Sequence, residues 1–175
     1  MSCLIVNLFG QPGAGKSTGA AYIFAMLKMA GVNAELVTEF AKDKTWEDNK
    51  EALKNQNYVF GKQSFKISRC ADKVDVIVTD SPLLLSAIYD EKHSIALKNH
   101  IFEEFNSYDN MNYVIKRVKP YNPVGRNQNE EQSDEIYGKL VNFLLSENVH
   151  YFEVPGDIDG YNLIVNQIKE KLKIN

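Results

Sequence analysis

The chain has 175 residues, of which 44% are hydrophobic and 25% are charged, which is ordinary for a single globular domain over 1–175. A net charge of −3 excludes a global positive field for nucleic acid, and Cys3 and Cys70 are too few for a disulfide framework or a zinc site. No apolar run approaches membrane-spanning length and the apolar N-terminus lacks a basic leader, so we expect a cytoplasmic protein without a membrane partner.

The first predicted elements are a strand, a glycine-rich loop and a helix. The apolar run Leu4–Phe9 precedes Gly10–Thr18, whose sequence GQPGAGKST fits the Walker A pattern, and helically spaced apolar residues follow as far as Ala30. Glycines let successive backbone N–H groups converge on a phosphate, and the helix N-terminus adds a positive dipole. Lys16 is expected to reach the β- and γ-phosphates, and Ser17 to bind Mg²⁺. The residues expected to bind ATP are Gly10, Pro12, Gly13, Ala14, Gly15, Lys16, Ser17 and Thr18.

Four further strands and several helices are predicted after this loop. The strands are the apolar or half-apolar runs 33–38, 74–79, 112–118 and 149–154. Helices are predicted over 44–71 with a break near Gly61, from Pro82, over 97–108 before a turn at Asp109–Asn110, from about Glu130, and over 161–172. Strands that alternate with helices predict a three-layer α/β P-loop NTPase with a five-stranded parallel sheet and helices on both faces.

Two acidic residues follow predicted strands at the edge where parallel sheets bind ligands. Asp80 closes the Walker B run VDVIVTD and is expected to hold Mg²⁺ beside Ser17, with capping of the next helix as the alternative. Glu39 follows the second strand, where a carboxylate can accept the proton of an attacking hydroxyl; the alternative is a solvated turn residue.

A basic segment follows the fourth strand. Between Lys116 and Arg126 it carries four cations in eleven residues, together with two prolines and a glycine. We expect a short lid over about 117–130 that closes over the nucleotide, with Arg117 and Arg126 stabilising the transferring charge. The alternative is a solvated basic loop balanced by the acidic residues that follow Asn129.

Two glutamines, Gln56 and Gln63, lie in the inward stripe of the 44–71 segment. Their amides can recognise an acceptor base, or the helix is rotated so that both face water. Three nearby aromatic residues, Trp46, Tyr58 and Phe65, can stack on a base or pack in the core. These two sets define a candidate acceptor site together with the acidic residue after the second strand.

Four segments in order, FGQPGAGKST, ELVTEFAKD, VDVIVTDSPLLLS and RVKPYNPVGRNQ, carry a resemblance to a known family. They resemble small P-loop kinases of the AAA_28-like family, related to the nicotinamide riboside kinase domain of the NadR type, and most closely versions encoded by tailed bacteriophages. Some of those relatives are 5-hydroxymethyluracil DNA kinases. The resemblance implies a nucleoside-monophosphate-kinase-like core with a central first strand, active-site acids Glu39 and Asp80, and a lid over Arg117–Arg126.

The same resemblance implies ATP and Mg²⁺ as cofactors and a hydroxyl acceptor as substrate. The acceptor it favours is 5-hydroxymethyluracil in phage DNA, which places the protein in the host cytoplasm. The alternatives are a nicotinamide riboside, nucleoside or nucleotide kinase, and an ATPase or NTP switch without an acceptor. The oligomeric state stays open.

Overall fold

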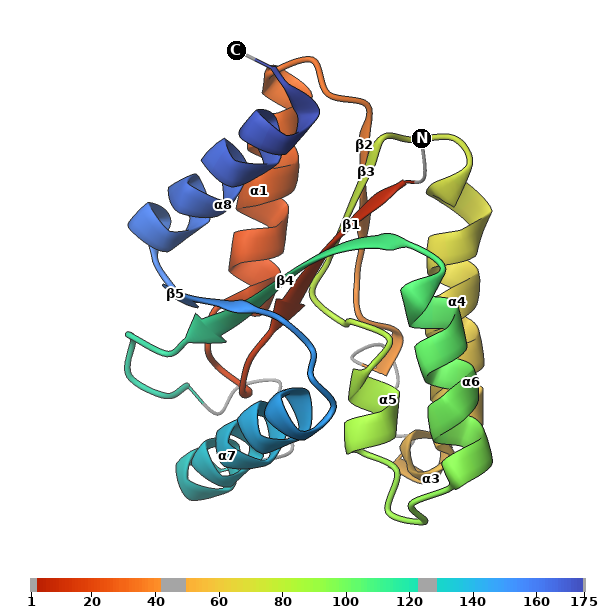
Figure 1. Ribbon diagram of the computed structural model, residues 1–175. Helices are drawn as coiled ribbons and strands as arrows, with labels where there is room; N and C mark the ends of the chain where they lie inside the picture. Colours follow the sequence, from red (N-terminus) through yellow and green to blue (C-terminus); the bar gives the residue numbers. More distant parts are fainter. Residues whose placement is uncertain (1–2, 42–49, 123–128, 175) are drawn as a thin grey trace.

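The computed structural model describes residues 3–41, 50–122 and 129–174. Its centre is a five-stranded, fully parallel sheet in the order β2-β3-β1-β4-β5 (Figure 1). The first strand is therefore central, as predicted. The strands are β1 (Leu4–Phe9), β2 (Ala34–Val37), β3 (Val76–Thr79), β4 (Asp109–Lys116) and β5 (Phe152–Pro155).

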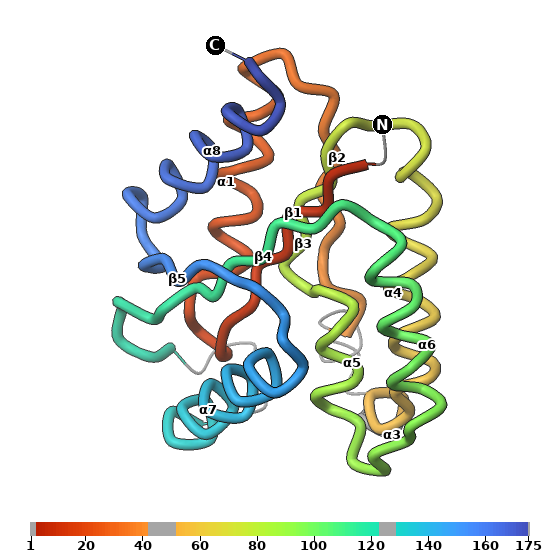
Figure 2. Tube along the Cα trace, viewed as in Figure 1, coloured from red at the N-terminus to blue at the C-terminus, as the bar shows by residue number. Residues whose placement is uncertain are grey.

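Helices cover both faces of this sheet. In Figure 1, α1 and α8 lie together on one side, and α4, α5, α6 and α7 lie on the other; the trace in Figure 2 shows the same division. The helices are α1 (Lys16–Met29), α3 (Lys50–Lys54), α4 (Gln56–Ala71), α5 (Leu85–Ile88), α6 (Ile95–Asn106), α7 (Glu130–Ser146) and α8 (Ile158–Leu172).

The central strand shows why two helical layers are needed. All six residues of β1 are buried, and its side chains point alternately to the two faces. Leu4, Val6 and Leu8 pack with residues of α1 and α8, whereas Ile5 and Phe9 pack with residues of α4, α6 and α7. A strand that is apolar on both faces needs cover on both, so the predicted three-layer α/β architecture is confirmed.

Three predicted element boundaries are wrong. The helical break after α3 falls at Asn55, whose side chain accepts a hydrogen bond from Tyr58 N (3.2 Å) and caps α4, while Gly61 lies inside that helix. The helix expected from Pro82 begins only at Leu85, after a turn in which Leu85 N donates to Pro82 O (3.0 Å).

The third wrong boundary is the turn predicted at Asp109–Asn110. Both residues begin β4, where they pair with Leu4 and Ile5 of β1. Asn110 Oδ1 also accepts a hydrogen bond from Asn7 Nδ2 (2.8 Å), so a residue type typical of turns is used here within the sheet.

Among the described helices, none combines the length and the apolarity required to cross a membrane.

Candidate active site

The glycine-rich loop connects β1 to α1 at the carboxyl edge of the sheet. Gly10 and Gly15 have φ angles of 146° and 102°, which residues with a side chain rarely adopt. A Cβ on Gly10 would lie 2.7 Å from Ile115 O, so the loop packs directly against β4. The first turn of α1 contains no acidic residue to offset the positive end of the helix dipole. This geometry fits the phosphates of a nucleotide.

Lys16, the first residue of α1, turns back over the loop. Its Nζ donates hydrogen bonds to Gly10 O (2.8 Å) and Gln11 O (3.1 Å). Ser17 and Thr18 follow on the first turn and are exposed, so their hydroxyls are accessible to a ligand. The loop thus offers an ammonium group and two hydroxyls beside its backbone N–H groups.

The turn between β5 and α8 supports the same loop from behind. Tyr161 Oη donates to Gly15 O (2.9 Å), and Gly156 N donates to Lys116 O (2.8 Å). A Cβ on Gly156 would collide with Ala14 O, so only glycine allows this approach. Sequence reasoning assigned no functional role to these residues; the signal that pointed there was Gly156, two residues after the end of the fifth predicted strand.

Asp80 and Glu39 follow adjacent strands, β3 and β2. Asp80 is 3% exposed, and its Oδ1 accepts a hydrogen bond from Glu39 N (3.0 Å). Asp80 therefore holds the backbone at Glu39 and does not cap α5, which begins five residues later. Among the described residues, this hydrogen bond uses only Oδ1 of Asp80. The second oxygen, Oδ2, is therefore able to bind a cation or a water molecule of its hydration shell, which fits the expected Mg²⁺ site.

The two glutamines of α4 are both buried, so the alternative that they face water is wrong. Gln63 Oε1 accepts from Phe40 N (3.1 Å), and its Nε2 donates to Thr79 Oγ1 (3.4 Å), which fixes the segment beside Glu39. Gln56 Nε2 donates to Leu53 O (2.8 Å), while its Oε1 is buried without a hydrogen-bond partner among the described residues. Such an orphaned acceptor is able to bind an N–H donor.

The aromatic residues near these glutamines are only partly accounted for. Phe65 is 65% exposed and Tyr58 is 38% exposed, so neither is a core residue. The Tyr58 ring packs edge-on against Phe40, with centroids 5.5 Å apart. Trp46 lies outside the described residues.

Arg117 lies immediately after β4 and is held by α7. Its Nη2 lies 2.8 Å from Asp134 Oδ1 and 3.1 Å from Glu130 Oε1, and its side chain is only 13% exposed. The guanidinium also lies 5.5 Å from the centroid of the Tyr121 ring. Acidic residues of α7 therefore balance at least this cation of the basic segment. Arg126 and the middle of the predicted lid, residues 123–128, lie outside the described residues.

The start of α7 also contacts the glycine-rich loop. Gln11 Nε2 donates to Asp134 Oδ1 (2.6 Å), and Ser133 Oγ donates to Pro12 O (2.8 Å). Sequence reasoning treated the acidic residues of α7 as a counter-charge and gave Ser133 no role. No local pattern marks these contacts, because they join residues more than 120 positions apart.

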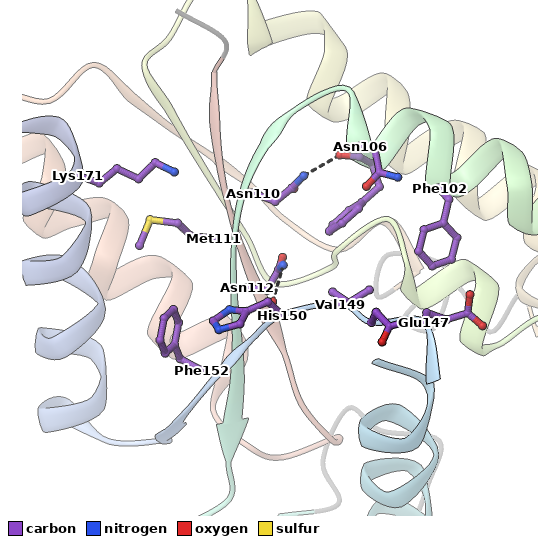
Figure 3. Close-up of a pocket in the computed structure, with 12 residues that line it drawn as sticks. Phe102, Asn106, Asn110, Met111, Asn112, Glu147, Val149, His150, Phe152 and Lys171 are labelled. Atoms are coloured by element: carbon purple, nitrogen blue, oxygen red, sulfur yellow. Dashed lines mark hydrogen bonds between the residues drawn. The ribbon is translucent and has the colours of Figure 1, made fainter. Parts of the chain in front are cut away.

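A cavity of about 540 Å³ lies away from this site, where β4 begins (Figure 3). Asparagines from β4 line it, but their amides are already engaged. Asn110 Nδ2 donates to Phe105 O (2.7 Å) and Tyr108 O (3.0 Å), and Asn112 Nδ2 donates to His150 O (3.0 Å). We therefore assign the nucleotide to the glycine-rich loop at the opposite end of the sheet.

The AAA_28 family, described as an AAA domain, matches this chain over residues 5–160. The chain belongs to the AAA_28 family. The match includes the glycine-rich loop, both candidate acids, Arg117 and the contacting residues of α7. No curated protein matches the chain in sequence.

Solved structures show which fold this AAA_28 chain has. Deoxyadenosine kinase from M. mycoides with bound dATP superposes with a TM-score of 0.59 at 21% identity, covering 97% of this chain and 100% of that one. The same enzyme with the products dCMP and dCDP gives 0.58 at 20% identity, covering 97% and 98%. Thymidylate kinase from Ehrlichia chaffeensis gives 0.59 at 13% identity, covering 99% and 100%. The fold is therefore the nucleoside-monophosphate-kinase-like P-loop fold.

Proposed function

We propose that this AAA_28 protein is a single-domain, ATP-dependent kinase that transfers the γ-phosphate to a hydroxyl group. The observation that carries the proposal is that Glu39 and Asp80 are neighbours at the edge of the sheet that carries the lysine-bearing loop, where the backbone N–H of Glu39 donates to Asp80 Oδ1 (3.0 Å). The Asp80 carboxylate suits Mg²⁺, and the Glu39 carboxylate suits the activation of an acceptor. The names of the structural neighbours, both kinases, support the same class.

Each part of the site has one task in this proposal. The loop Gly10–Thr18 holds the ATP phosphates, and Lys16 exchanges its two loop carbonyls for phosphate oxygens. Ser17 and Asp80 would hold Mg²⁺, which neutralises charge on the β- and γ-phosphates.

In the transfer step, the oxygen of the acceptor hydroxyl attacks the γ-phosphorus, and Glu39 accepts the proton of that hydroxyl. The bond from that phosphorus to the bridging oxygen breaks, and ADP leaves. Arg117 and Arg126 are proposed to stabilise the transferring charge within a lid over about 117–130, of which residues 123–128 lie outside the described residues.

For the acceptor, we propose the base 5-hydroxymethyluracil in DNA, with phosphorylation of its hydroxymethyl group. The four-segment resemblance to phage-encoded kinases supports this choice. The unpartnered Oε1 of Gln56 adds an acceptor for the N–H that a uracil ring carries, while Gln63 holds the adjoining backbone. A base in duplex DNA would have to leave the stack to reach such a buried group.

A free nucleoside, a nucleotide or nicotinamide riboside is the second candidate acceptor. The names deoxyadenosine kinase and thymidylate kinase favour small acceptors, as does the net charge of −3, since DNA binding draws on phosphate contacts from Lys and Arg. The third possibility is an ATPase or switch without an acceptor, in which water would take the place of the acceptor hydroxyl.

An acceptor panel with γ-labelled ATP and Mg²⁺ tests these alternatives. Single-stranded and duplex oligonucleotides containing 5-hydroxymethyluracil are compared with the same oligonucleotides containing thymine, and with deoxyadenosine, thymidine, thymidine monophosphate and nicotinamide riboside. We expect label and the added mass of one phosphoryl group only in the hydroxymethylated DNA. Transfer to a small acceptor would select the second candidate, and ATP turnover unaffected by every acceptor would select the third.

A further inference from the structure

We propose that Asp134, together with Ser133, is a positioning residue that holds Arg117 at a fixed place relative to the glycine-rich loop. The inference rests on the proposed kinase function, in which Arg117 stabilises the transferring phosphoryl group. Asp134 and Ser133 lie within the first turn and a half of α7. They connect two other parts of the chain, the glycine-rich loop and Arg117 just after β4. They would act through Arg117, without touching the substrate.

A single carboxylate oxygen joins the two parts of the site. Asp134 Oδ1 accepts hydrogen bonds from Gln11 Nε2 at 2.6 Å and from Arg117 Nη2 at 2.8 Å. Ser133 Oγ makes a second bridge, because it donates to Pro12 O at 2.8 Å and accepts from Arg117 Nη1 at 3.4 Å. The guanidinium is therefore connected to two consecutive loop residues through two consecutive helix residues.

Burial distinguishes this arrangement from an ordinary surface ion pair. Ser133 is 0% exposed and Gln11 is 6% exposed, and the Arg117 side chain is 13% exposed. An exposed pair contributes little, because water and salt screen it and both side chains lose freedom. Here three of the four connected side chains are enclosed, and only the Asp134 side chain, which is 56% exposed, reaches solvent.

The helix that carries the bridge has a fixed start. Asn129 Oδ1 accepts from Gln132 N (2.8 Å), and Gln132 Oε1 accepts from Asn129 N (2.9 Å), which forms a capping box. A guanidinium has five N–H donors, and the hydrogen bonds to Asp134 and Ser133 use two of them, while Glu130 Oε1 lies 3.1 Å from Nη2 as an ion-pair partner. Within the described part of the site, Arg117 therefore keeps N–H groups for a phosphoryl oxygen.

Asp134→Asn tests the bridge, with Glu131→Gln as the matched control. Glu131 is exposed on the same first turn, so both variants remove one negative charge from the start of α7. We expect Asp134→Asn to lower kcat for phosphoryl transfer by about 10- to 100-fold, because a misplaced charge loses most of its effect on the transition state. The KM for ATP and the thermal unfolding midpoint should stay close to wild type, and Glu131→Gln should match wild type in all three.

The double variant Arg117→Gln/Asp134→Asn decides whether the effect passes through Arg117. If Asp134 acts by positioning Arg117, the double variant has the kcat of Arg117→Gln alone. A wild-type kcat for Asp134→Asn, or a double variant that multiplies the two losses, would overturn the inference and leave the kinase proposal intact. Failure of the wild-type protein to transfer phosphate to any acceptor would reject the kinase proposal, and this inference with it.

Discussion

Lys16 is the residue whose surroundings say most about nucleotide entry. Its ammonium donates hydrogen bonds to two neutral carbonyls of the loop, at 2.8 Å and 3.1 Å. A hydrogen bond to a neutral carbonyl is weaker than one to a charged oxygen. Phosphate oxygens can therefore replace Gly10 O and Gln11 O as partners of Nζ.

Lys16→Ala should abolish turnover while the fold is retained. We expect kcat for ADP release to fall by at least about 100-fold, because a charge that stabilises the transition state is removed. The side chain is half-buried, and water can replace its hydrogen bonds to the two loop carbonyls, so the thermal midpoint should change little. Lys28→Ala, at an exposed position near the end of the same helix, is the control. Turnover that survives in Lys16→Ala would reject the assignment of this loop as the ATP site.

Glu39→Gln separates the proposed base from the backbone that carries it. The variant keeps Glu39 N as the donor to Asp80 Oδ1, so the Mg²⁺ side of the site should be unchanged. Loss of a general base lowers kcat by about 10²- to 10⁴-fold, and we expect this loss with a nearly constant KM for ATP. Glu35→Gln, on β2, controls for the lost charge. A kcat equal to wild type would return Glu39 to the alternative of a solvated turn residue.

At the scale of elements, the nucleotide loop depends on two segments that follow it far along the chain. The β5–α8 turn contacts its second half through Gly156 and Tyr161, and α7 contacts its first half through Ser133 and Asp134. Among these contacts, only the one from Tyr161 reaches a signature residue, at the carbonyl of Gly15; the others reach Gln11, Pro12 and Ala14. The loop conformation is thus a property of the assembled sheet and not of the motif alone.

Gly156→Ala tests the support given by the β5–α8 turn. The new Cβ would collide with Ala14 O and lie 2.9 Å from Lys116 O, so the loop or β4 must shift. We expect the protein to lose about 1–3 kcal/mol of unfolding free energy and the KM for ATP to rise, measured by urea unfolding and ADP release.

Gly138→Ala is the opposite control. Gly138 lies within α7, where nothing lies within 4 Å of an added Cβ, so this variant should gain up to about 1 kcal/mol from helix propensity. If both glycine variants gained stability, the close packing of the turn against the loop would be disproved.

Elements with a strong local period were predictable, and those set by tertiary contacts were not. The strands, α1 and α8 follow directly from their apolar patterns, and the loop from its glycines and lysine. The helix start at Leu85 was missed because Pro82, a residue that favours the first position of a helix, instead accepts the hydrogen bond of the turn that precedes the helix, from Leu85 N. Asp109–Asn110 was missed because buried amide pairing outweighs the preference of these residues for turns.

The candidate site divides in the same way. Glu39 and Asp80 were predictable as strand-end residues, since parallel strands bring their carboxyl ends to one edge. That Gln63 holds Phe40 N, and that Asp134 holds Arg117, depends on how α4 and α7 pack on the sheet. A single sequence carries no local signal for such contacts, which join segments on different layers.

The whole molecule encloses ionisable groups between its layers, which sets its behaviour at high pH. Burial raises the pKa of Cys3 from 9.0 to about 11, and burial followed by the charge of Glu104 raises that of Tyr108 from 10.0 to about 12. Burial also raises the pKa of Tyr113 and, with a contribution from Asp157, that of Tyr161. Each of these groups therefore keeps its proton up to a higher pH in the folded chain than in the unfolded chain.

Stability should therefore fall as the pH rises above about 9. Since the folded pKa of Cys3 is the higher one, its contribution is complete below the unfolded value of 9.0 and is lost as the pH rises toward about 11. We expect a loss of about 1–2 kcal/mol from Cys3 by about pH 10.5, measured as a lower urea midpoint than at about pH 7.5. Cys3→Ala should show a smaller pH-dependent drop. An equal drop in both proteins would mean that other groups cause it.

The asparagines shared by β1 and β4 have a consequence for how the site is assembled. Asn7 Nδ2 donates to Asn110 Oδ1 (2.8 Å) and Asn112 Oδ1 (3.0 Å) within an otherwise apolar face. Sliding one strand by a single residue would turn one set of amides to the opposite face and leave buried polar groups unpaired. The amides thus select one alignment of two strands, of which one leads into the phosphate loop and the other into Arg117. The spacing of lysine and arginine around a nucleotide is accordingly determined during folding, by three neutral side chains within the sheet.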